Sequence, residues 1–553
     1  MYITKVPYTS KSGKIYHSIL LRESYRENGK VKNRTIASLT RCSPQEIAAI
    51  QLALEHKDDL TVLASLKDSV ELQEGPSVGA VWTVYQIAKR LGIEKALGTS
   101  FDGKLALWQV VARVIEQGSR LSAVRLARVH AACDILKMQR GFDENDLYDN
   151  LRWLSQHQEK IERRLLLSRR SNKKPELFFY DVTSSYLEGE NNQLAAYGYN
   201  RDKKRGKQQL VIGLLCDESG EPVSIDVFPG NTQDPQTVSS QIRKVTQRFG
   251  CHRITFVGDR GMLKKKQIDA LCEVDFYYIT AITKPQIRTL MKADIIQMEM
   301  FGEQVHEVQQ KGVRYILRRN PQRTKEIAMT RSQKRQSIDQ LVQQENVYLK
   351  EHPRAQVSKA AERVQARIQR LRIQSWLSAI PESESRTLCL QVDEAALEHT
   401  SLLDGCYVIK SDLPQSIADK QLIHDRYKEL SQVERAFRTC KTEHLELRPV
   451  YVQTESNTRG HVLVVMLAYL VVRELRREWS ALDVTVQEGL AQLSTLCAME
   501  MKVDGQGTCL RIPTPRQLSQ ELLKALGIQL PTVLPHKEFP VVTRKRLTKQ
   551  RKA

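Results

Sequence analysis

Residues 176–187 read ELFFYDVTSSYL, and this stretch decides the fold class. Aromatic and β-branched residues dominate it, which is typical of a buried strand. Asp181 interrupts the apolar run, and a charge in such surroundings is costly unless it is paired or binds a metal ion. The stretch therefore predicts a core strand that presents one carboxylate for chemistry.

The segments that follow alternate between strands and helices. QLVIGLLCDESGEPVSIDVF at 209–228 predicts two strands joined by a turn at 218–220. Three hairpin-like strands followed by helix–strand alternation predict an α/β fold with a mixed sheet. The further elements expected in this sheet are a helix at about 235–249, strand RITFVGD (253–259), helix KKKQIDALC (264–272), strand FYYITAI (276–282) and strand CYVIKSDL (406–413).

The chain before this core divides into two parts. Residues 1–42 alternate apolar and polar positions around a turn at 27–29, which predicts a β-hairpin module with basic faces. Residues 43–170 have helical periodicity and predict a helical DNA-binding domain. Within it, VYQIAKRLGIEKAL (84–97) has the pattern of a helix-turn-helix with Gly92 at the turn. An ordinary pair of packed helices explains the same pattern.

Residues 285–403 are expected to interrupt the sheet as an inserted α+β subdomain. They open with a predicted hairpin, QVHEVQQKGVRYILRR, and continue into a basic helical stretch and the strand RTLCLQVDE. Ala360, Val364, Ile368 and Leu371 form the apolar stripe of an amphipathic helix. The predicted core therefore comprises 171–284 and 404–480, and 481–553 form a helical C-terminal region with a basic tail.

The charge balance points to a polyanionic partner. The 553 residues include 85 Lys and Arg against 64 Asp and Glu, a net charge of +21. Such an excess favours nucleic acid or an anionic membrane, and by itself it does not indicate an enzyme. The apolar run 462–472 is shorter than the about 20 residues that cross a bilayer, and no signal-peptide core is present. Ten scattered cysteines indicate free thiols, so we expect a cytoplasmic protein without a membrane segment.

Three carboxylates are candidates for a catalytic metal site. Asp181 lies within a predicted strand, Asp259 ends another, and Glu434 lies on the helix expected at 425–440. Carboxylates from separate elements could hold two Mg²⁺ ions for phosphodiester chemistry. Taken singly, Asp259 could instead cap the next helix, and Glu434 could form a surface salt bridge. The three together, in this order, favour the metal site.

The ordered motifs resemble the DDE transposases of bacterial insertion sequences, specifically the insertion-sequence-four-like group. That group has a Tyr-x2-Arg-x3-Glu-x6-Lys signature, and YKELSQVERAFRTCK places Tyr427, Glu434 and Lys441 in register. Leu430 stands where the signature has Arg, and Arg435 or Arg438 could replace its phosphate contact. The other matching motifs are DVTSSYLEG (181–189), FPGNTQD (228–234), GDRGM (258–262), HPRA (352–355) and RGHVLVVMLAYLV (459–471).

The resemblance implies a ribonuclease H-like core in which Asp181, Asp259 and Glu434 bind two Mg²⁺ ions, with Mn²⁺ as a possible substitute. It implies cleavage and strand transfer at terminal inverted repeats, with Tyr427 and Lys441 facing bound DNA. Double-stranded DNA, as the element's ends and as the target, is the expected partner, and the chain is expected to dimerise on it. Two alternatives stay open: a related nuclease without strand transfer, and a DNA-binding protein derived from a transposase with an inactive site.

Overall fold

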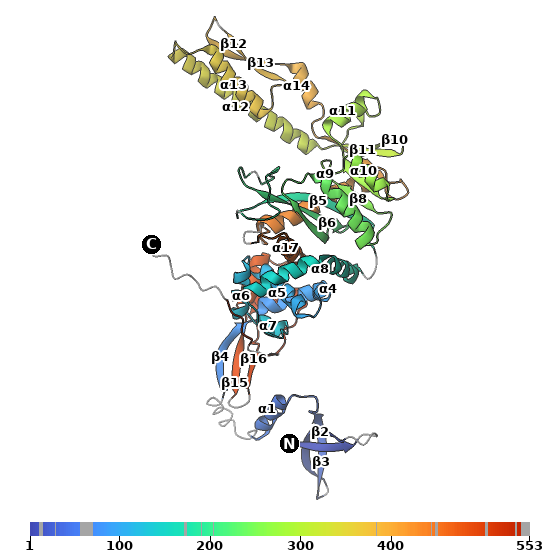
Figure 1. The fold of residues 1–553 in the computed structure, drawn as a ribbon, viewed down its shortest axis with the longest axis vertical. Coiled ribbons are helices and arrows are strands. Elements are labelled where there is room, and N and C mark those ends of the chain that lie inside the picture. Colours follow the sequence, from blue (N-terminus) through green and yellow to red (C-terminus); the bar gives the residue numbers. More distant parts are fainter. Residues whose placement is uncertain are drawn as a thin grey trace. The chain divides into compact units, whose positions relative to one another are not determined.

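The computed structural model describes residues 1–9, 15–27, 29–55, 70–170, 174–189, 191–202, 204–382, 384–443, 445–447, 452–503, 507–536 and 539–543. The chain forms two compact units, one of residues 1–150 with 471–553 and the other of residues 151–470. The cations predicted in the tail lie outside the described residues, as does the turn residue Asn28. Figure 1 shows the elements of both units.

The second unit is built on an eight-stranded mixed sheet of order β10-β11-β14-β9-β8-β5-β6-β7. Strands β5, β6 and β7 form an antiparallel meander, β8 and β9 run parallel to β5, and β14, β11 and β10 extend the sheet by antiparallel pairing. The strands are β5 (Leu177–Tyr186), β6 (Gln209–Asp217), β7 (Pro222–Pro229), β8 (Thr255–Gly258), β9 (Tyr277–Ala281), β10 (His306–Gln310), β11 (Val313–Arg319) and β14 (Cys406–Ser411).

The apolar core lies on one face of β5. Phe178, Tyr180 and Val182 pack with side chains of α9 (Asp234–Arg243) and α10 (Lys265–Cys272). Side chains alternate along a strand, so Asp181 lies on the opposite face of the sheet from this core. Helices α15 (Lys420–Glu429) and α16 (Ser431–Arg438) contact strands of the sheet, including β8 and β5. Asp181 thus lies on the face of the sheet opposite this apolar cluster.

The strands predicted for the core are confirmed, as are the helices predicted at about 235–249 and at 264–272. One difference concerns the hairpin β10–β11, which the sequence assigned to the insertion 285–403. Strand β11 pairs with β14 over Arg314–Arg319, so this hairpin extends the large sheet. Buried Arg314 forms an ion pair with Glu307 and donates hydrogen bonds to the carbonyl oxygens of Leu413 and Ala418, which holds the loop that leads into α15.

The chain between β11 and β14 forms a helical hairpin and a small two-stranded sheet. Helices α12 (Pro321–Glu351) and α13 (Val357–Leu371) pack against strands β12 (Leu377–Glu382) and β13 (Thr387–Val392), followed by α14 (Glu394–Ser401) (Figure 1). Ala360, Val364 and Ile368 are fully buried in their own cluster with Trp376. The predicted amphipathic stripe is therefore confirmed, and the segment has a core separate from that of the sheet.

The first unit contains two sheets. Strands β1 (Tyr2–Thr9), β2 (Ile15–Glu27) and β3 (Lys30–Ser38) form an antiparallel sheet, so the predicted hairpin is confirmed and a third strand joins it. Helix α1 (Pro44–Glu55) follows. The second sheet has the order β17-β16-β15-β4, from strands β4 (Val70–Ser77), β15 (Cys497–Val503), β16 (Gly507–Arg511) and β17 (Val533–Pro535). Strands from both ends of the chain therefore complete one sheet.

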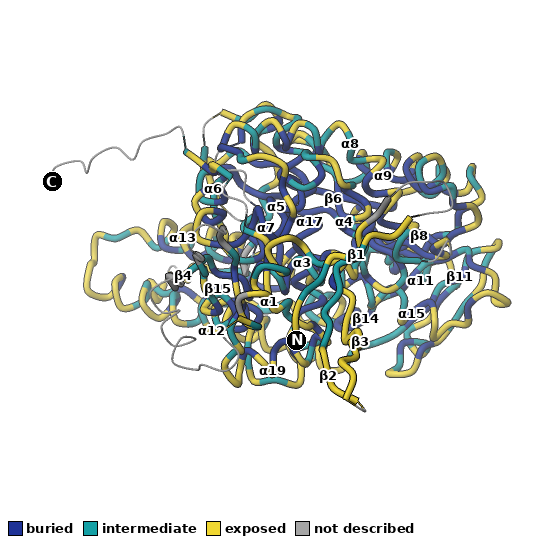
Figure 2. Tube along the Cα trace, turned by 90° about the horizontal axis from the view of Figure 1, so that it is seen from below, coloured by how far each residue is buried: buried dark blue, intermediate teal, exposed yellow. Residues whose placement is uncertain are grey.

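Helices make up the rest of the first unit, and Figure 2 shows buried chain along several of them. They are α3 (Gly79–Arg90), α4 (Ile93–Leu97), α5 (Phe101–Ile115), α6 (Arg120–Val129), α7 (Ala132–Ile135), α18 (Val486–Ser494) and α19 (Gln517–Ala525). The predicted helix pair around Gly92 is confirmed, with Gly92 at φ 74°. DNA reading by α4 stays a prediction, although this helix has five residues, three of them buried.

Helices α8 (Glu144–Arg170) and α17 (Glu455–Glu478) contain the boundaries between the two units. The apolar run 462–472 lies in α17 and is buried throughout, as expected of a core helix. Among the described residues, no helix combines the length and the apolar character that a membrane span requires. His461, just before this run, donates a hydrogen bond of 3.1 Å from Nε2 to the backbone oxygen of Leu447.

Candidate active site

Asp181 lies at the centre of β5, directly opposite Leu214 of β6. It is the one residue of β5 that is partly exposed, whereas the other nine are buried. The backbone at this position is fixed by pairing with β6, and the pairing of β5 with β8 ends at the preceding residue, Tyr180. A carboxylate on such a backbone has little freedom to move, which suits a group that must hold its position during a reaction.

Asp259 follows the last residue of β8, the strand parallel to β5. Its backbone oxygen accepts hydrogen bonds from the amides of Met262 and Leu263, which form a tight turn. The N-cap of the next helix is Lys264, and no side chain caps that helix. The alternative that Asp259 caps the following helix is therefore wrong, and its carboxylate is available for another role.

Glu434 lies in the first turn of α16 and is exposed. The sequence predicted one helix over about 425–440, whereas the chain forms α15, α16 and a π-helical segment, Thr439–Glu443. Glu434 makes no ion pair with any residue in the described part of the chain, so its alternative role in a surface salt bridge has no support among these residues. A free carboxylate beside the sheet is available to bind an ion.

The two flanking signature residues contact the strands that carry the aspartates. The Tyr427 hydroxyl donates a hydrogen bond of 3.2 Å to Oδ1 of Asp259. Lys441 Nζ lies 3.3 Å from Oγ1 of Thr183 and 2.5 Å from the backbone oxygen of Ser184, both on β5. Because Thr183 shares a face with Asp181, Lys441 lies on the side of the sheet where Asp181 projects.

The pKa of the Asp181 carboxyl depends on the charges of the other two acidic residues. Burial, together with the negative charges of Asp259 and Glu434, raises the pKa of Asp181 to about 7, against the lowering effects of a backbone hydrogen bond and of Arg201. The charges of Asp259 and Glu434 therefore act on Asp181 although the successive gaps between the three residues in the sequence are 78 and 175 positions. As they stand, no three His, Cys, Asp or Glu side chains in the described ranges are gathered closely enough to hold a metal ion.

Leu430, which replaces the signature Arg, has a structural role. It is 6% exposed and lies at the junction of α15 and α16, where it ends one helix and precedes the other. Arg435 and Arg438 are exposed on α16. The two arginines that could replace the missing phosphate contact are therefore on the surface, whereas position 430 belongs to the core.

Sequence reasoning missed Asp202. Its carboxylate pairs with Lys441 at 2.6 Å and accepts a hydrogen bond from the backbone amide of Tyr186. The neighbouring Arg201 pairs with Asp234 at 2.6 Å, and its charge acts on Asp181. Asp202 is the acidic residue within the basic run RDKKRGK, and a lone acid among cations was the signal that could have identified it.

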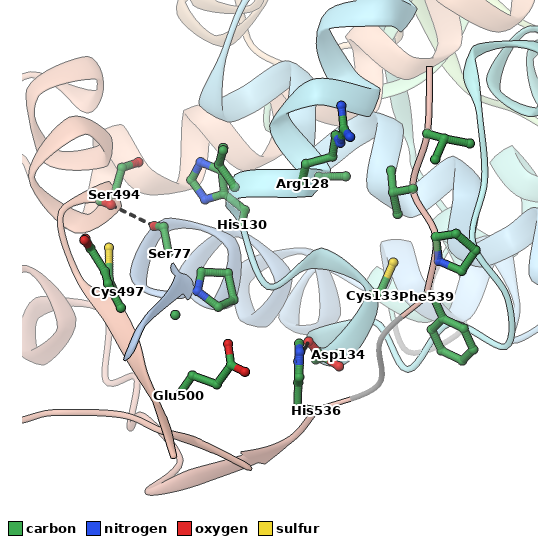
Figure 3. Close-up of a pocket in the computed structure, with 18 residues that line it drawn as sticks. Ser77, Arg128, His130, Cys133, Asp134, Ser494, Cys497, Glu500, His536 and Phe539 are labelled. Atoms are coloured by element: carbon green, nitrogen blue, oxygen red, sulfur yellow. Dashed lines mark hydrogen bonds and ion pairs between the residues drawn. The ribbon is translucent and has the colours of Figure 1, made fainter. Parts of the chain in front are cut away.

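A cavity of about 880 Å³ lies in the first unit and is separate from these residues. Figure 3 shows side chains from both sequence segments of this unit around it, including His130, Asp134 and His536. His536 Nδ1 lies 3.2 Å from Asp134 Oδ2, which ties the C-terminal segment to α7. None of Asp181, Asp259 and Glu434 lines this cavity.

Comparison with known proteins identifies the family. Residues 3–62 match the model for the N-terminal domain of the IS1634 family transposases, and residues 172–471, more than half of the chain, match the transposase DDE domain. No curated protein matches the sequence.

Two solved transposase structures are distantly similar. One is a piggyBac transposase synaptic complex with hairpin DNA, at 8% identity and a TM-score of 0.36, covering 76% of this chain and 82% of the other. The second is a Mos1 transposase paired-end complex with the left transposon end, at 13% identity and a TM-score of 0.14, covering 27% of this chain and 52% of the other. Since the DDE-domain match spans more than half of its length, the chain belongs to the DDE transposases of bacterial insertion sequences, enzymes that cleave DNA and transfer its strands.

Proposed function

We propose that Asp181, Asp259 and Glu434 are the catalytic carboxylates of this transposase and that together they bind two Mg²⁺ ions, for which Mn²⁺ can substitute. DDE transposases generally use divalent metal ions. The observation that carries the proposal is the shared electrostatic environment of the three residues, in which the charges of Asp259 and Glu434 act on the half-buried Asp181. Three like charges near one another are unfavourable, and a divalent cation between them offsets their repulsion.

The donor set fits this ion. Carboxylate oxygens are the hard ligands that Mg²⁺ prefers, and the middle of β5 and the end of β8 hold two of the three carboxylates on a rigid sheet. The bound ions supply an activated hydroxyl nucleophile and charge stabilisation at the leaving oxygen. Glu434 is exposed on a helix, so its side chain is the one of the three with most freedom to move toward the aspartates.

The strand order supports a ribonuclease H-like core. Strands β7-β6-β5-β8-β9 form an antiparallel meander followed by two strands parallel to β5. In this arrangement Asp181 lies on the central strand of the five and Asp259 follows its parallel neighbour. The additional strands β14, β11 and β10 extend the sheet beyond that core, and the helical hairpin α12–α13 forms the inserted subdomain.

Two residues have positioning roles in this proposal. Tyr427 donates to Asp259 and therefore orients the carboxylate without itself binding the ion. Lys441 is fixed against β5 by Thr183, Ser184 and Asp202, where an ammonium stabilises the negative charge of a DNA strand next to Asp181. Tyr427 thus acts on the site from α15, before the helix that carries Glu434, and Lys441 acts from the π-helical segment after it.

The proposed substrate is double-stranded DNA with the terminal inverted repeats of the element. The chain nicks each end by hydrolysis and joins the released 3′-hydroxyl to target DNA. The net charge of +21 supports broad phosphate contact. Two ends must be joined to one target, and we expect a homodimer assembled on the paired ends.

The test is an assay with a duplex that carries the element's end and a supercoiled target plasmid. The proposal predicts end cleavage with Mg²⁺ or Mn²⁺, no cleavage with EDTA, and joined products with the plasmid. Cleavage without joined products would identify a nuclease that lacks strand transfer. Binding without cleavage at any Mg²⁺ concentration would identify a DNA-binding protein with an inactive site.

A further inference from the structure

The N-terminal sheet β1–β3 exposes most of both its faces. All nine residues of β3 are exposed, and Figure 2 shows this strand in the exposed colour. Large exposed apolar or aromatic side chains of the sheet include Val31 and Ile36 on β3, 64% and 46% exposed, and Tyr8 on β1, 59% exposed. An open three-stranded sheet with apolar side chains in water is stabilised when a partner covers it.

The strand register divides the outer part of the sheet into two faces, because directly paired residues project to the same side. The pairs Arg22↔Thr35, Ser24↔Asn33 and Arg26↔Val31 lie on one face, as does Tyr2, which pairs with Arg22. We name it the Arg22 face. The pairs Glu23↔Arg34, Tyr25↔Lys32 and Glu27↔Lys30 lie on the other, the Glu23 face.

The Glu23 face largely neutralises its own charge. Arg34 lies 2.7 Å from Glu23, and Lys32 lies 2.6 Å from Glu27. The Arg34 guanidinium also stacks over the Tyr25 ring at 5.7 Å. Most cations of the Glu23 face are therefore paired with acidic residues of the same sheet.

The Arg22 face differs in charge and in chemistry. It carries Arg22 and Arg26 and no acidic residue, and Arg26 forms no ion pair with any residue that the structure describes. Hydroxyl and amide groups lie between the two arginines. Arg22 Nε donates to Thr35 Oγ1 at 3.3 Å, and Ser24 Oγ donates to Asn33 Oδ1 at 2.7 Å. Arginine beside amides and hydroxyls is a set that can bind both phosphates and base edges.

We propose that the Arg22 face of the sheet β1–β3 is a DNA-binding surface that lies in a groove of the element's end. A two-stranded ribbon fits the major groove of B-DNA, and arginine at its centre can bind guanine by two hydrogen bonds. The face is positive and carries no acid, so it complements a polyanion and repels an identical face of a second copy. This inference rests on the proposed function, since it assigns the element's end as the DNA that is bound.

The test compares two neighbouring cations on opposite faces of the full-length protein. Arg26→Ala removes a cation from the Arg22 face, and Lys30→Ala removes one from the Glu23 face near the same turn and breaks no described ion pair. Gel shifts are run in EDTA with a duplex carrying the terminal inverted repeat and with a scrambled duplex. We expect Arg26→Ala to weaken binding of the repeat by about tenfold. Lys30→Ala should weaken it by less than about twofold.

Equal losses from both variants would overturn the inference, because they would indicate attraction by net charge alone. Undiminished binding by Arg26→Ala would also overturn it. If that variant instead changed the sedimentation of the protein without DNA, the face would be a contact between copies of the chain. The proposed active site is tested separately, since Asp181→Asn should bind like wild type in EDTA whatever the outcome for Arg26.

Discussion

Lys441 and Asp202 form an ion pair of 2.6 Å that fixes the π-helical segment after α16 to the loop after β5. Asp202 Oδ2 also accepts the backbone amide of Tyr186, the last residue of β5. The pair therefore joins the helix that carries Glu434 to the strand that carries Asp181. Neither residue has to bind metal for this contact to position the site.

This contact leads to a prediction for Lys441. Lys441→Ala should lower end cleavage by about tenfold, because a hydrogen-bonded charge contributes about 1.5–3 kcal/mol. Since the ammonium is partly buried and already engaged, the loss should persist from low to high salt. The Mg²⁺ concentration for half-maximal cleavage should stay constant, because Lys441 does not bind the ion. A marked rise in that concentration would contradict the positioning role, and Lys428→Ala on α15 serves as the control.

Tyr427 should affect the metal site through Asp259. Tyr427→Phe removes the hydroxyl that donates to Asp259 and keeps the ring. Burial and the nearby Asp259 raise the pKa of Tyr427, so the hydroxyl stays a neutral donor at working pH. We expect about tenfold slower cleavage, with a higher Mg²⁺ requirement and unchanged DNA binding. Cleavage by Tyr427→Phe at the wild-type rate would remove this residue from the site.

Restoring the signature arginine should harm the protein. Leu430 is 6% exposed, so Leu430→Arg places a charge in the core at the helix junction. We expect a loss of at least about 3 kcal/mol in the free energy of unfolding, measured by urea denaturation. Leu430→Met, which keeps an apolar side chain of similar volume, should cost less than about 1.5 kcal/mol. Higher activity of Leu430→Arg with full stability would contradict the core role of this position.

The buried pair Asp226–Lys244 predicts a dependence of stability on pH. Burial acts to raise the pKa of Asp226, but the charge of Lys244, 2.6 Å away, and hydrogen bonds from Gln241 and Lys244 outweigh it, so the pKa is lowered. The pKa of such a carboxyl is lower in the folded chain than in the unfolded chain, where it is about 3.9. The ionised carboxyl therefore stabilises the fold above about pH 3.9, and this contribution is lost as the pH falls through the folded pKa.

Unfolding should therefore become easier below about pH 4, and Asp226→Asn should show a shallower pH dependence. At neutral pH this variant leaves Lys244 buried and unpaired, which costs about 3 kcal/mol. Thermal unfolding from about pH 2 to pH 7 measures both effects. Glu273→Gln, at an exposed carboxylate of the same unit, should follow the wild-type curve. An identical slope for Asp226→Asn and wild type would refute the linkage.

The sequence predicted the strands of the core well, because the hydrophobic periodicity and the residue composition of a segment determine its local secondary structure. ELFFYDVTSSYL and the segments after it carry the β-branched and aromatic residues of buried strands, and each became the expected strand. The pairing of β11 with β14 was missed. The sequence of a hairpin does not show whether the hairpin forms a separate sheet or pairs with the edge of a larger one. The third strand of the N-terminal sheet was missed for the same reason.

The site was predictable in its residue types but not in its contacts. Asp181, Asp259 and Glu434 were chosen from order and motif, whereas the partner of Lys441 was not. The helix was expected to be continuous, so Tyr427, Glu434 and Lys441 were placed on one face facing DNA. A π-helical segment begins before Lys441, and the Lys441 side chain contacts β5 and Asp202, while the DNA contacts of Tyr427 and Lys441 stay a prediction. An ion pair between residues 239 positions apart leaves no pattern in the sequence.

The central claim is that Asp181, Asp259 and Glu434 act together in metal-dependent cleavage, and one measurement tests it most directly. End cleavage with Mg²⁺ is measured for Asp181→Asn, Asp259→Asn and Glu434→Gln, with DNA binding measured on the same samples. Glu429→Gln, on the neighbouring helix, is the matched control. The account predicts that each of the three variants loses cleavage and keeps DNA binding, while Glu429→Gln cleaves like wild type. Cleavage near the wild-type rate by any one of the three would contradict the claim for that residue.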